Sequence, residues 1–181
     1  VSAMVQMREF ENDKYLIMAT KNGTVKKTSI SAYTNIRKSG IQAITLREGD
    51  ELIDVTISDN SNNIMLVTKN GQGIKFRESD VRETGRSAMG VRGIELKGND
   101  EVISMQLDTE GEYILIVSAN GMGKRTPFTE FKLQNRGGKG VKCYKITEKT
   151  GEVVGAKAVN DGNEIMMITN EGIVIRMFVD D

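Results

Sequence analysis

The stretch YLIMATKNGTVKKTSISAY, residues 15–33, decides the fold because its pattern returns three more times along the chain. In each copy an apolar run leads into a turn that ends in glycine, and an alternating run that carries bases follows. The turn glycines are Gly23, Gly71, Gly121 and Gly172, so successive copies lie 48 to 51 residues apart. An Asn-Gly turn between two such runs is a strong β-hairpin signal. We therefore predict a hairpin at each glycine, with a type I′ turn and positive φ at both turn residues where Asn precedes Gly.

The second half of each unit recurs as well. A further glycine follows 17 to 19 residues later, at Gly40, Gly90 and Gly140, and an acidic turn then leads into another strand-like run. We therefore predict four short strands in each unit: two around the first turn, one after the second glycine and one after the acidic turn. Four-stranded repeats near 50 residues are typical of propeller-like architectures. The predicted fold is an all-β array of four-stranded antiparallel blades that forms an incomplete ring.

The repeat pattern also predicts the domain boundaries. Residues 1–13 are expected to be the last strand of a preceding blade. Three whole repeats cover residues 14–62, 63–112 and 113–162, and residues 163–181 form the first hairpin of a partial blade. The chain opens on a strand-like pattern without an initial Met, so we interpret it as a piece of a longer chain.

Composition excludes several kinds of site. The 181 residues include one cysteine and no histidine, which rules out an intramolecular disulfide, imidazole chemistry and zinc sites built on His or paired Cys. Cys143 is expected to be a small packed residue, and a single cysteine fits a reducing cytoplasm. No apolar run approaches the roughly 20 residues of a membrane helix. We predict no membrane contact, catalytic residue, metal site or cofactor for this chain.

Charge is divided within each repeat although the 25 basic and 25 acidic residues give a net charge of zero. Residues 21–47 contain six bases and no acid, whereas the next stretch to residue 62 holds five acids. The fourth residue after each turn glycine is basic: Lys27, Lys75, Arg125 and Arg176. Equivalent positions of a radial repeat lie in equivalent places, so the bases should form a band suited to duplex phosphates. The alternative is that these charges are solvated decoration.

The loop QNRGGKG, residues 134–140, is the strongest candidate for an anion-binding element. Gly137 and Gly138 would let backbone N–H groups approach phosphate oxygens as a small nest, with charge from Arg136 and Lys139. An ordinary exposed basic turn is the alternative. Exposed aromatics that could stack bases are few, since Tyr33, Phe128 and Phe131 also suit core packing. The pattern favours contact with the DNA backbone, without direct sequence readout.

Several stretches resemble one family: NGTVKKTSISAY, SDVRETGRSAMGVRGIELKGNDEVISM, NGMGKRTPFTEF and EIMMITNEGIVIR. They are similar to the C-terminal domain of the A subunit of bacterial DNA gyrase, and the resemblance covers essentially the whole chain. QNRGGKG resembles the gyrase box Q-R-R-G-G-K-G, with Asn135 in place of its first Arg. The resemblance implies a six-bladed β-pinwheel whose neighbouring blades exchange strands and whose basic outer rim wraps duplex DNA. By its surroundings the chain resembles blades three to five and the start of the sixth, so its box-like loop would support wrapping.

The resemblance also implies the biological setting. The parent enzyme would be an ATP-dependent type II topoisomerase that introduces negative supercoils, using ATP and Mg through other domains and the other gyrase polypeptide. Its partners would be double-stranded DNA, the rest of the gyrase A subunit, and the gyrase B subunit, on the chromosome in the bacterial cytoplasm. Two alternatives stay open at this point: the C-terminal domain of the A subunit of topoisomerase IV, and a propeller-type protein-interaction scaffold.

The residues expected to contact DNA are the bases of the repeated stretches together with the box-like loop. They are Lys26, Lys27, Arg37, Lys38, Lys75, Arg77, Arg86, Arg92, Lys124, Arg125, Gln134, Arg136, Gly137, Gly138, Lys139, Lys142 and Arg176.

Overall fold

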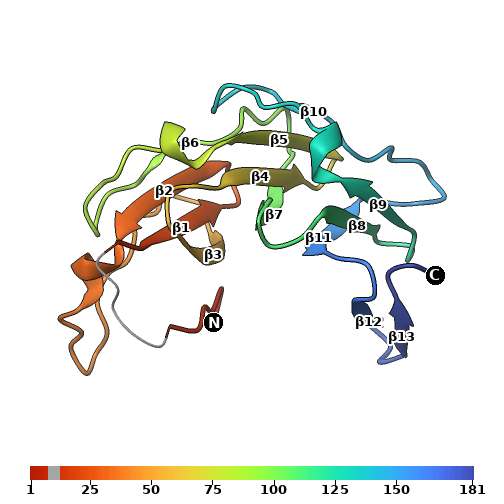
Figure 1. The fold of residues 1–181 in the computed structure, drawn as a ribbon, viewed down its shortest axis with the longest axis horizontal. Coiled ribbons are helices and arrows are strands. Elements are labelled where there is room, and N and C mark those ends of the chain that lie inside the picture. The colour runs from red at the N-terminus through yellow and green to blue at the C-terminus, as the bar shows by residue number, and fades with distance from the viewer. Residues whose placement is uncertain (8–12) are drawn as a thin grey trace.

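The computed structural model describes residues 1–7 and 13–181. Regular structure in this part of the chain consists of β-strands and three short 3-10 helices, with no α-helix among the described residues. The strands form four antiparallel sheets that follow one another around an arc (Figure 1). The predicted all-β, propeller-like architecture is confirmed. Among the described residues, no helix has the length and apolar character needed to cross a bilayer.

The first sheet has the strand order β3-β1-β2-β6. Its central hairpin joins β1 (Tyr15–Thr20) to β2 (Thr24–Ser29), and β3 (Leu52–Ser58) pairs with the other edge of β1. The outer strand β6 (Val91–Arg92) pairs with β2 and comes from the next repeat. The 3-10 helix η1 (Ile30–Tyr33) follows β2 directly.

The second sheet repeats this order as β7-β4-β5-β10. Its strands are β4 (Asn63–Thr68), β5 (Gln72–Arg77), β7 (Val102–Leu107) and, from the following repeat, β10 (Val141–Lys142). The helix η2 (Glu78–Asp80) follows β5. The outer strand therefore crosses from one repeat to the one before it in two successive sheets.

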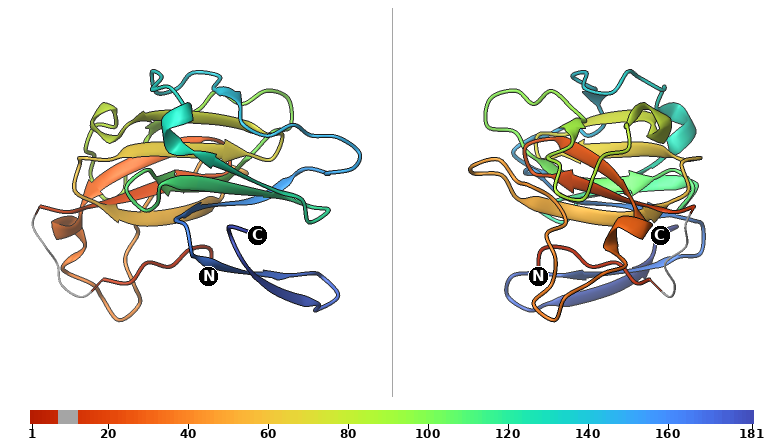
Figure 2. Two further views of the ribbon diagram at one scale, coloured as in Figure 1. Left: turned by 45° about the vertical axis from the view of Figure 1, so that its right-hand side comes forward. Right: turned by 90° about the vertical axis from the view of Figure 1, so that its left-hand side faces the viewer.

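The third sheet has three strands, in the order β11-β8-β9, and a separate hairpin completes the set. The strands are β8 (Tyr113–Ser118), β9 (Gly123–Pro127) and β11 (Val153–Val159), and η3 (Phe128–Glu130) follows β9. The two-stranded sheet pairs β12 (Glu164–Ile168) with β13 (Val174–Phe178). Figure 2 shows the sheets as successive layers, with the β12–β13 hairpin and the N-terminal segment on the same side.

Strand exchange between neighbouring sheets, which the resemblance implied, is confirmed by the pairings of β6 with β2 and of β10 with β5. The strand expected after the second glycine exists in two repeats but lies in the preceding sheet. After Gly40 the corresponding residues form no strand. Residues 1–7 also form no strand, and residues 8–12, which belong to the expected strand at 1–13, lie outside the described residues. The repeat boundaries stay a proposal.

The predicted type I′ turns are wrong. Gly23, Gly71 and Gly121 have φ of +86°, +80° and +78°, but among the described residues Asn60 is the one non-glycine with positive φ. Each hairpin instead has a three-residue loop closed by a hydrogen bond such as Gly23 N–H to Thr20 O, 3.0 Å. Three-residue loops need a left-handed residue only at their last position, which is the glycine.

The acidic turn that recurs in the sequence has a structural role in the first two repeats. The Asp50 carboxylate accepts a hydrogen bond of 2.9 Å from the Asn22 N–H, and Asp100 accepts one of the same length from the Asn70 N–H. The acids at these two positions therefore cap the neighbouring hairpin loop, which explains why an acid recurs in this phase.

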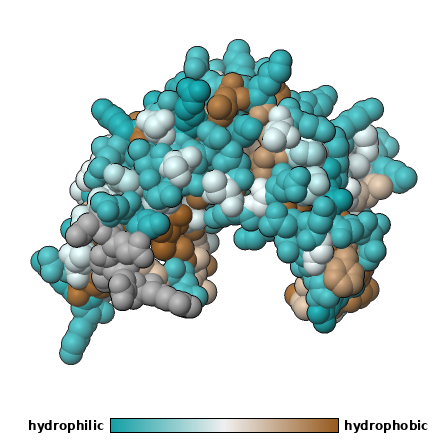
Figure 3. Space-filling view, in the orientation of Figure 1, coloured by the Kyte–Doolittle hydropathy of each residue, from teal (hydrophilic) through white to brown (hydrophobic). Residues whose placement is uncertain are grey.

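The hydrophobic core lies between the sheets rather than within one of them. Ile64 and Leu66 of β4 pack with Ile17 of the first sheet, while Met65 of the same strand packs with Ile114 of the third. A strand buried on both faces needs a continuous apolar run, which residues 64–67 provide. Each fully buried side chain of this size contributes about 1.5–3 kcal/mol. Large apolar side chains of the β12–β13 hairpin are exposed at one end of the arc, visible as brown atoms in Figure 3: Met166, Ile168, Val174, Ile175 and Phe178.

Candidate nucleic-acid interface

The segments after η2 and η3 run beside β2 and β5, respectively, of the preceding sheet. The Thr84 N–H donates to Lys27 O at 2.9 Å, and the Gln134 N–H donates to Lys75 O at 2.8 Å. Residues 81–92 and 131–142 consequently lie along the convex side of the arc, next to the labels β6 and β10 in Figure 1. We call these two segments, together with residues 34–45 of the first repeat, the rim loops.

Exposed cations recur on the rim loops and on the strands beside them. They include Arg37 and Lys38 in the first repeat, Arg92 in the second, and Lys139 and Lys142 in the third. Other predicted contact residues that are exposed are Arg77, Lys124 and Arg176. Ammonium and guanidinium groups at the surface of three consecutive repeats can meet a long polyanion. This part of the predicted interface is therefore accessible on successive repeats.

Three predicted contact residues are buried in the protein. Lys26 is 1% exposed, Lys27 5% and Lys75 8%. Lys26 Nζ donates to Ala43 O at 2.6 Å and also to Arg86 O. Lys27 Nζ donates to the Asn60 side chain at 2.6 Å and to Glu78 O at 3.2 Å, and Lys75 Nζ donates to Phe128 O at 2.7 Å. Their charges are used to join neighbouring parts of the protein.

The remaining bases at the fourth position after the turn glycine are also paired inside the protein. Arg125 Nη1 lies 2.6 Å from the Asp161 carboxylate and 2.7 Å from that of Asp180, and its guanidinium lies over the Tyr113 ring, 4.5 Å from the centroid. Arg176 pairs with Glu164 on the facing strand. The base at this position therefore has a partner within the chain in all four copies, although the Arg176 side chain stays exposed.

Burial changes the acid–base properties of two of these groups. Burial, and secondarily the charge of Arg86, lowers the pKa of Lys26 from 10.5 to about 8. Burial also lowers the pKa of Lys27, although the nearby carboxylates of Glu78 and Glu83 oppose that effect.

The box-like loop does not present the nest that was predicted. The Gly137 N–H donates to Gly93 O at 2.8 Å, and the Gly138 N–H points to Asn135 O at 3.4 Å. Gly137 has φ of +84°, and the carbonyl of Gly138 accepts the Glu95 N–H at 2.8 Å. The two glycines shape a loop that is docked on the preceding repeat, so their N–H groups are engaged within the protein.

Arg136 is likewise engaged with the preceding repeat. Its Nε donates to Asp80 O at 2.9 Å and its Nη1 to Arg92 O at 2.6 Å. Arg86, one repeat earlier, donates from Nη1 to Gln42 O at 3.0 Å. In the box-like loop, Lys139 is left as the exposed cation, while Gln134 is half-buried.

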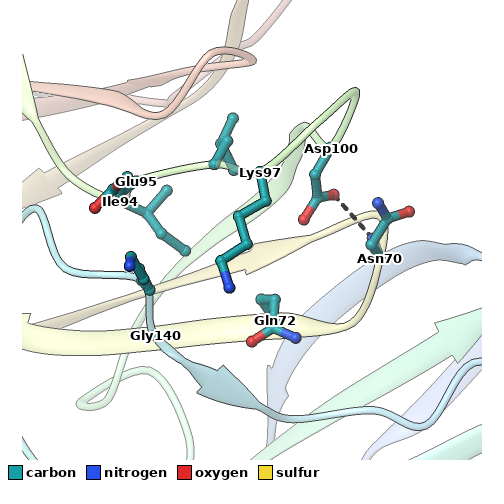
Figure 4. A pocket seen from close by; sticks show the side chains of 9 residues that line it. Asn70, Gln72, Ile94, Glu95, Lys97, Asp100 and Gly140 are labelled. Atoms are coloured by element: carbon teal, nitrogen blue, oxygen red, sulfur yellow. Dashed lines mark hydrogen bonds between the residues drawn. The ribbon is translucent and has the colours of Figure 1, made fainter.

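A hollow of about 370 Å³ lies beside the box-like loop, between the second sheet and the turn at residues 94–100. Figure 4 shows the Lys97 side chain extending across it toward Gln72, with Asp100 hydrogen-bonded to Asn70. Lys139 lines the same hollow. Lys97 was not among the predicted contact residues, because its sequence context is an acidic turn.

Two further exposed cations on the rim loops were missed, Arg82 and Lys132. Arg82 and Lys132 each lie two residues after the last residue of a 3-10 helix, η2 or η3. This shared sequence position is the signal that could have identified them. The aromatic candidates Tyr33, Phe128 and Phe131 are 5%, 4% and 9% exposed, so the interpretation that they pack in the core is confirmed. Cys143 is buried, as expected, and burial raises the pKa of its thiol to about 12.

Comparison with known proteins gives a consistent family. A family model described as the DNA gyrase C-terminal domain, beta-propeller, matches residues 14–59, 62–107, 112–160 and 163–181. The A subunit of DNA gyrase from Clostridium acetobutylicum is 52% identical over 181 residues, which are 100% of this chain and 22% of that protein. Its counterpart from Salmonella typhimurium is 42% identical over 100% of this chain and 21% of its own length. The chain thus spans about a fifth of the curated relatives that it matches.

Solved structures show the same fold. The C-terminal domain of DNA topoisomerase IV matches with a TM-score of 0.90 and 32% identity, over 97% of this chain and 55% of that one. The DNA gyrase A C-terminal domain matches with a TM-score of 0.88 and 28% identity, over 98% of this chain and 60% of that one. The matched family and the curated relatives do not favour the topoisomerase IV alternative.

Proposed function

The chain belongs to the DNA gyrase C-terminal domain family, and from this premise we propose that it binds duplex DNA along its convex rim and wraps it. Wrapping would support negative supercoiling by a type II topoisomerase, of which this chain is a non-catalytic part. The rest of the gyrase A subunit, together with the gyrase B subunit, would be its partners. The bacterial cytoplasm, where the chromosome lies, is the proposed location.

The observation that carries this proposal is the recurrence of exposed cations on successive rim loops. Arg37, Arg92 and Lys139 occupy the rim loops of three consecutive repeats, and these repeats follow one another around the arc. Each neutralised phosphate releases condensed counterions, and this entropy gain supplies most of the non-specific affinity for duplex DNA. Several cations along a curved surface would also offset the cost of bending, about 1–6 kcal/mol for 20–30 bp.

Recognition of the backbone rather than of bases is supported by the burial of the aromatic candidates. Tyr33, Phe128 and Phe131 pack in the cores, so they are not available as stacking platforms. The proposed contacts, Arg37, Lys38, Arg77, Arg92, Lys124, Lys139 and Lys142, can neutralise phosphate without reporting sequence. We leave out of this set the predicted residues that are buried, half-buried or paired within the protein: Lys26, Lys27, Lys75, Arg86, Arg125, Gln134, Arg136, Gly137, Gly138 and Arg176.

A binding titration tests the proposal. Two unrelated duplexes of about 150 bp should bind with similar affinity, and raising salt from 50 to 200 mM should weaken binding roughly 10³- to 10⁴-fold for about seven phosphate contacts. The double substitution Lys139→Ala and Lys142→Ala should reduce the slope of log affinity against log salt by about 2.

The matched control is Lys149→Ala, an exposed lysine of the acidic turn that is not part of the rim loops. It should leave the slope unchanged. Absence of binding at 50 mM salt would overturn the proposal and leave the protein-interaction scaffold as the better interpretation. A strong preference for one of the two duplexes would overturn the backbone mode of recognition.

A further inference from the structure

Two arginines make the same contact one repeat apart. Arg86 and Arg136 each stand four residues before the second glycine of their repeat, Gly90 and Gly140. Arg136 Nη1 donates to Arg92 O at 2.6 Å, and Arg86 Nη1 donates to Gln42 O at 3.0 Å. Each acceptor stands two residues after the second glycine of the preceding repeat. The contact therefore belongs to the repeat and not to one irregular loop.

Backbone hydrogen bonds join the same loops in the same phase. The Glu95 N–H donates to Gly138 O at 2.8 Å, and at the equivalent positions the Thr45 N–H donates to Ala88 O at 3.3 Å. The Gly137 N–H adds a bond of 2.8 Å to Gly93 O. The third rim loop is thus docked on residues 92–95, at the end of the second rim loop, and the second rim loop is docked on residues 42–45 of the first. The three loops form one connected series.

We propose that this series is a brace that sets the angle between successive sheets, and that Arg86 and Arg136 are positioning residues that act on bound DNA through it. This inference rests on the proposed function for its effect on DNA. Arg136 directs Nε to Asp80 O and Nη1 to Arg92 O, so these two groups cannot hold a phosphate at the same time. The exposed cations beside it, such as Lys139, make the contacts with phosphate.

The physical reason is pre-organisation. A bent duplex gains from the cations of several loops only when those loops are already held at the matching spacing. If the angle between sheets varies, the first cation can still contact a phosphate, but each later contact has the entropic cost of fixing that angle. Loss of the brace should therefore reduce bending much more than it reduces the number of phosphates neutralised on a short duplex.

The substitution Arg136→Lys tests the hydrogen bonds of Arg136 separately from its positive charge. Lysine keeps the positive charge but cannot donate to two carbonyl groups in the fixed fork of a guanidinium. We expect a salt slope on a 20 bp duplex within about 0.3 of that of the wild type, and reduced bending of a 150 bp duplex by fluorescence energy transfer. Lys139→Ala is the matched control: it should reduce the slope by about 1.

Hydrogen exchange without DNA gives a readout that does not depend on the proposed function. The amides of Gly137 and Glu95 should exchange about tenfold faster in Arg136→Lys, since the bonds they make lie in the released loop contact. Arg86→Lys is the second variant, and it should speed exchange at Thr45. Unchanged exchange in both variants would overturn the brace. Faster exchange without any binding of DNA by the wild type would instead overturn the proposed function alone.

Discussion

The ammonium group of Lys75 donates a hydrogen bond of 2.7 Å to the backbone oxygen of Phe128, the first residue of η3 in the next repeat. One repeat earlier, Lys27 donates to the backbone oxygen of Glu78, the first residue of η2. Both lysines are the fourth residue after a turn glycine. In these two copies the base ties its sheet to the repeat that follows, which gives its recurrence a structural role.

Replacing Lys75 with methionine should therefore destabilise the protein without weakening DNA binding. Methionine retains most of the buried aliphatic stem but removes one of the two hydrogen bonds that Phe128 O accepts, the other being from the Phe131 N–H. We expect the free energy of unfolding to fall by about 1 kcal/mol, measured by urea denaturation. The salt slope of DNA affinity should stay at its wild-type value.

Lys142→Met is the control for this substitution, because Lys142 is exposed. Its free energy of unfolding should change by less than about 0.5 kcal/mol, while its salt slope should fall by about 1. A Lys75→Met protein with wild-type stability and a reduced slope would show that Lys75 reaches phosphate after all.

Lys26 makes stability depend on pH in a direction opposite to that of a salt-bridged lysine. Burial lowers the pKa of Lys26 from 10.5 to about 8 in the folded protein, whereas the unfolded chain keeps the ordinary value. Between pH 8 and pH 10.5 the unfolded state therefore holds more protons, so the free energy of unfolding rises with pH. We compare the free energy of unfolding of the wild type with that of Lys26→Met. The wild-type value minus the variant value should increase from about pH 7.5 to about pH 10.

The difference between the two proteins isolates this group, because all other titrations are shared. Urea denaturation at the two pH values measures it. A difference that decreases with rising pH would mean that Lys26 is held in its charged form by partners stronger than the carbonyl groups of Ala43 and Arg86.

The repeat, the hairpins and the fold class could be predicted because their signals are local. Gly23 and the apolar run before it specify a hairpin whatever lies elsewhere, and four copies in phase specify a repeated sheet. The partner of Val91 could not be predicted in this way. It pairs with Val25, 66 residues earlier, and a two-residue strand carries no pattern that names its neighbour.

The candidate site shows the same division between local and long-range information. Several exposed cations of the rim loops, such as Arg37, Arg92 and Lys139, were predictable from charge and phase. The uses of Lys27, Lys75 and Arg136 were not, because the groups that engage them are backbone carbonyls 51 to 56 residues away, and a carbonyl has no signature in a sequence. The type of the hairpin loop was missed since a three-residue loop and a type I′ turn both place glycine last.

The box-like loop approaches the second sheet closely at Gly140. Gly140 has φ of +70°, and a Cβ there would lie 2.5 Å from Gly73 O, a backbone atom of β5 that cannot move without breaking the sheet. Gly40, the equivalent residue of the first repeat, has φ of +82° but nothing within 4 Å of such a Cβ. Gly40→Ala should therefore cost about 1–2 kcal/mol for the left-handed backbone alone. Gly140→Ala should cost about 1–3 kcal/mol more, because the loop has to lift from β5. Urea denaturation of the two variants measures the difference, and equal stabilities would show that the loop does not need this contact to stay docked.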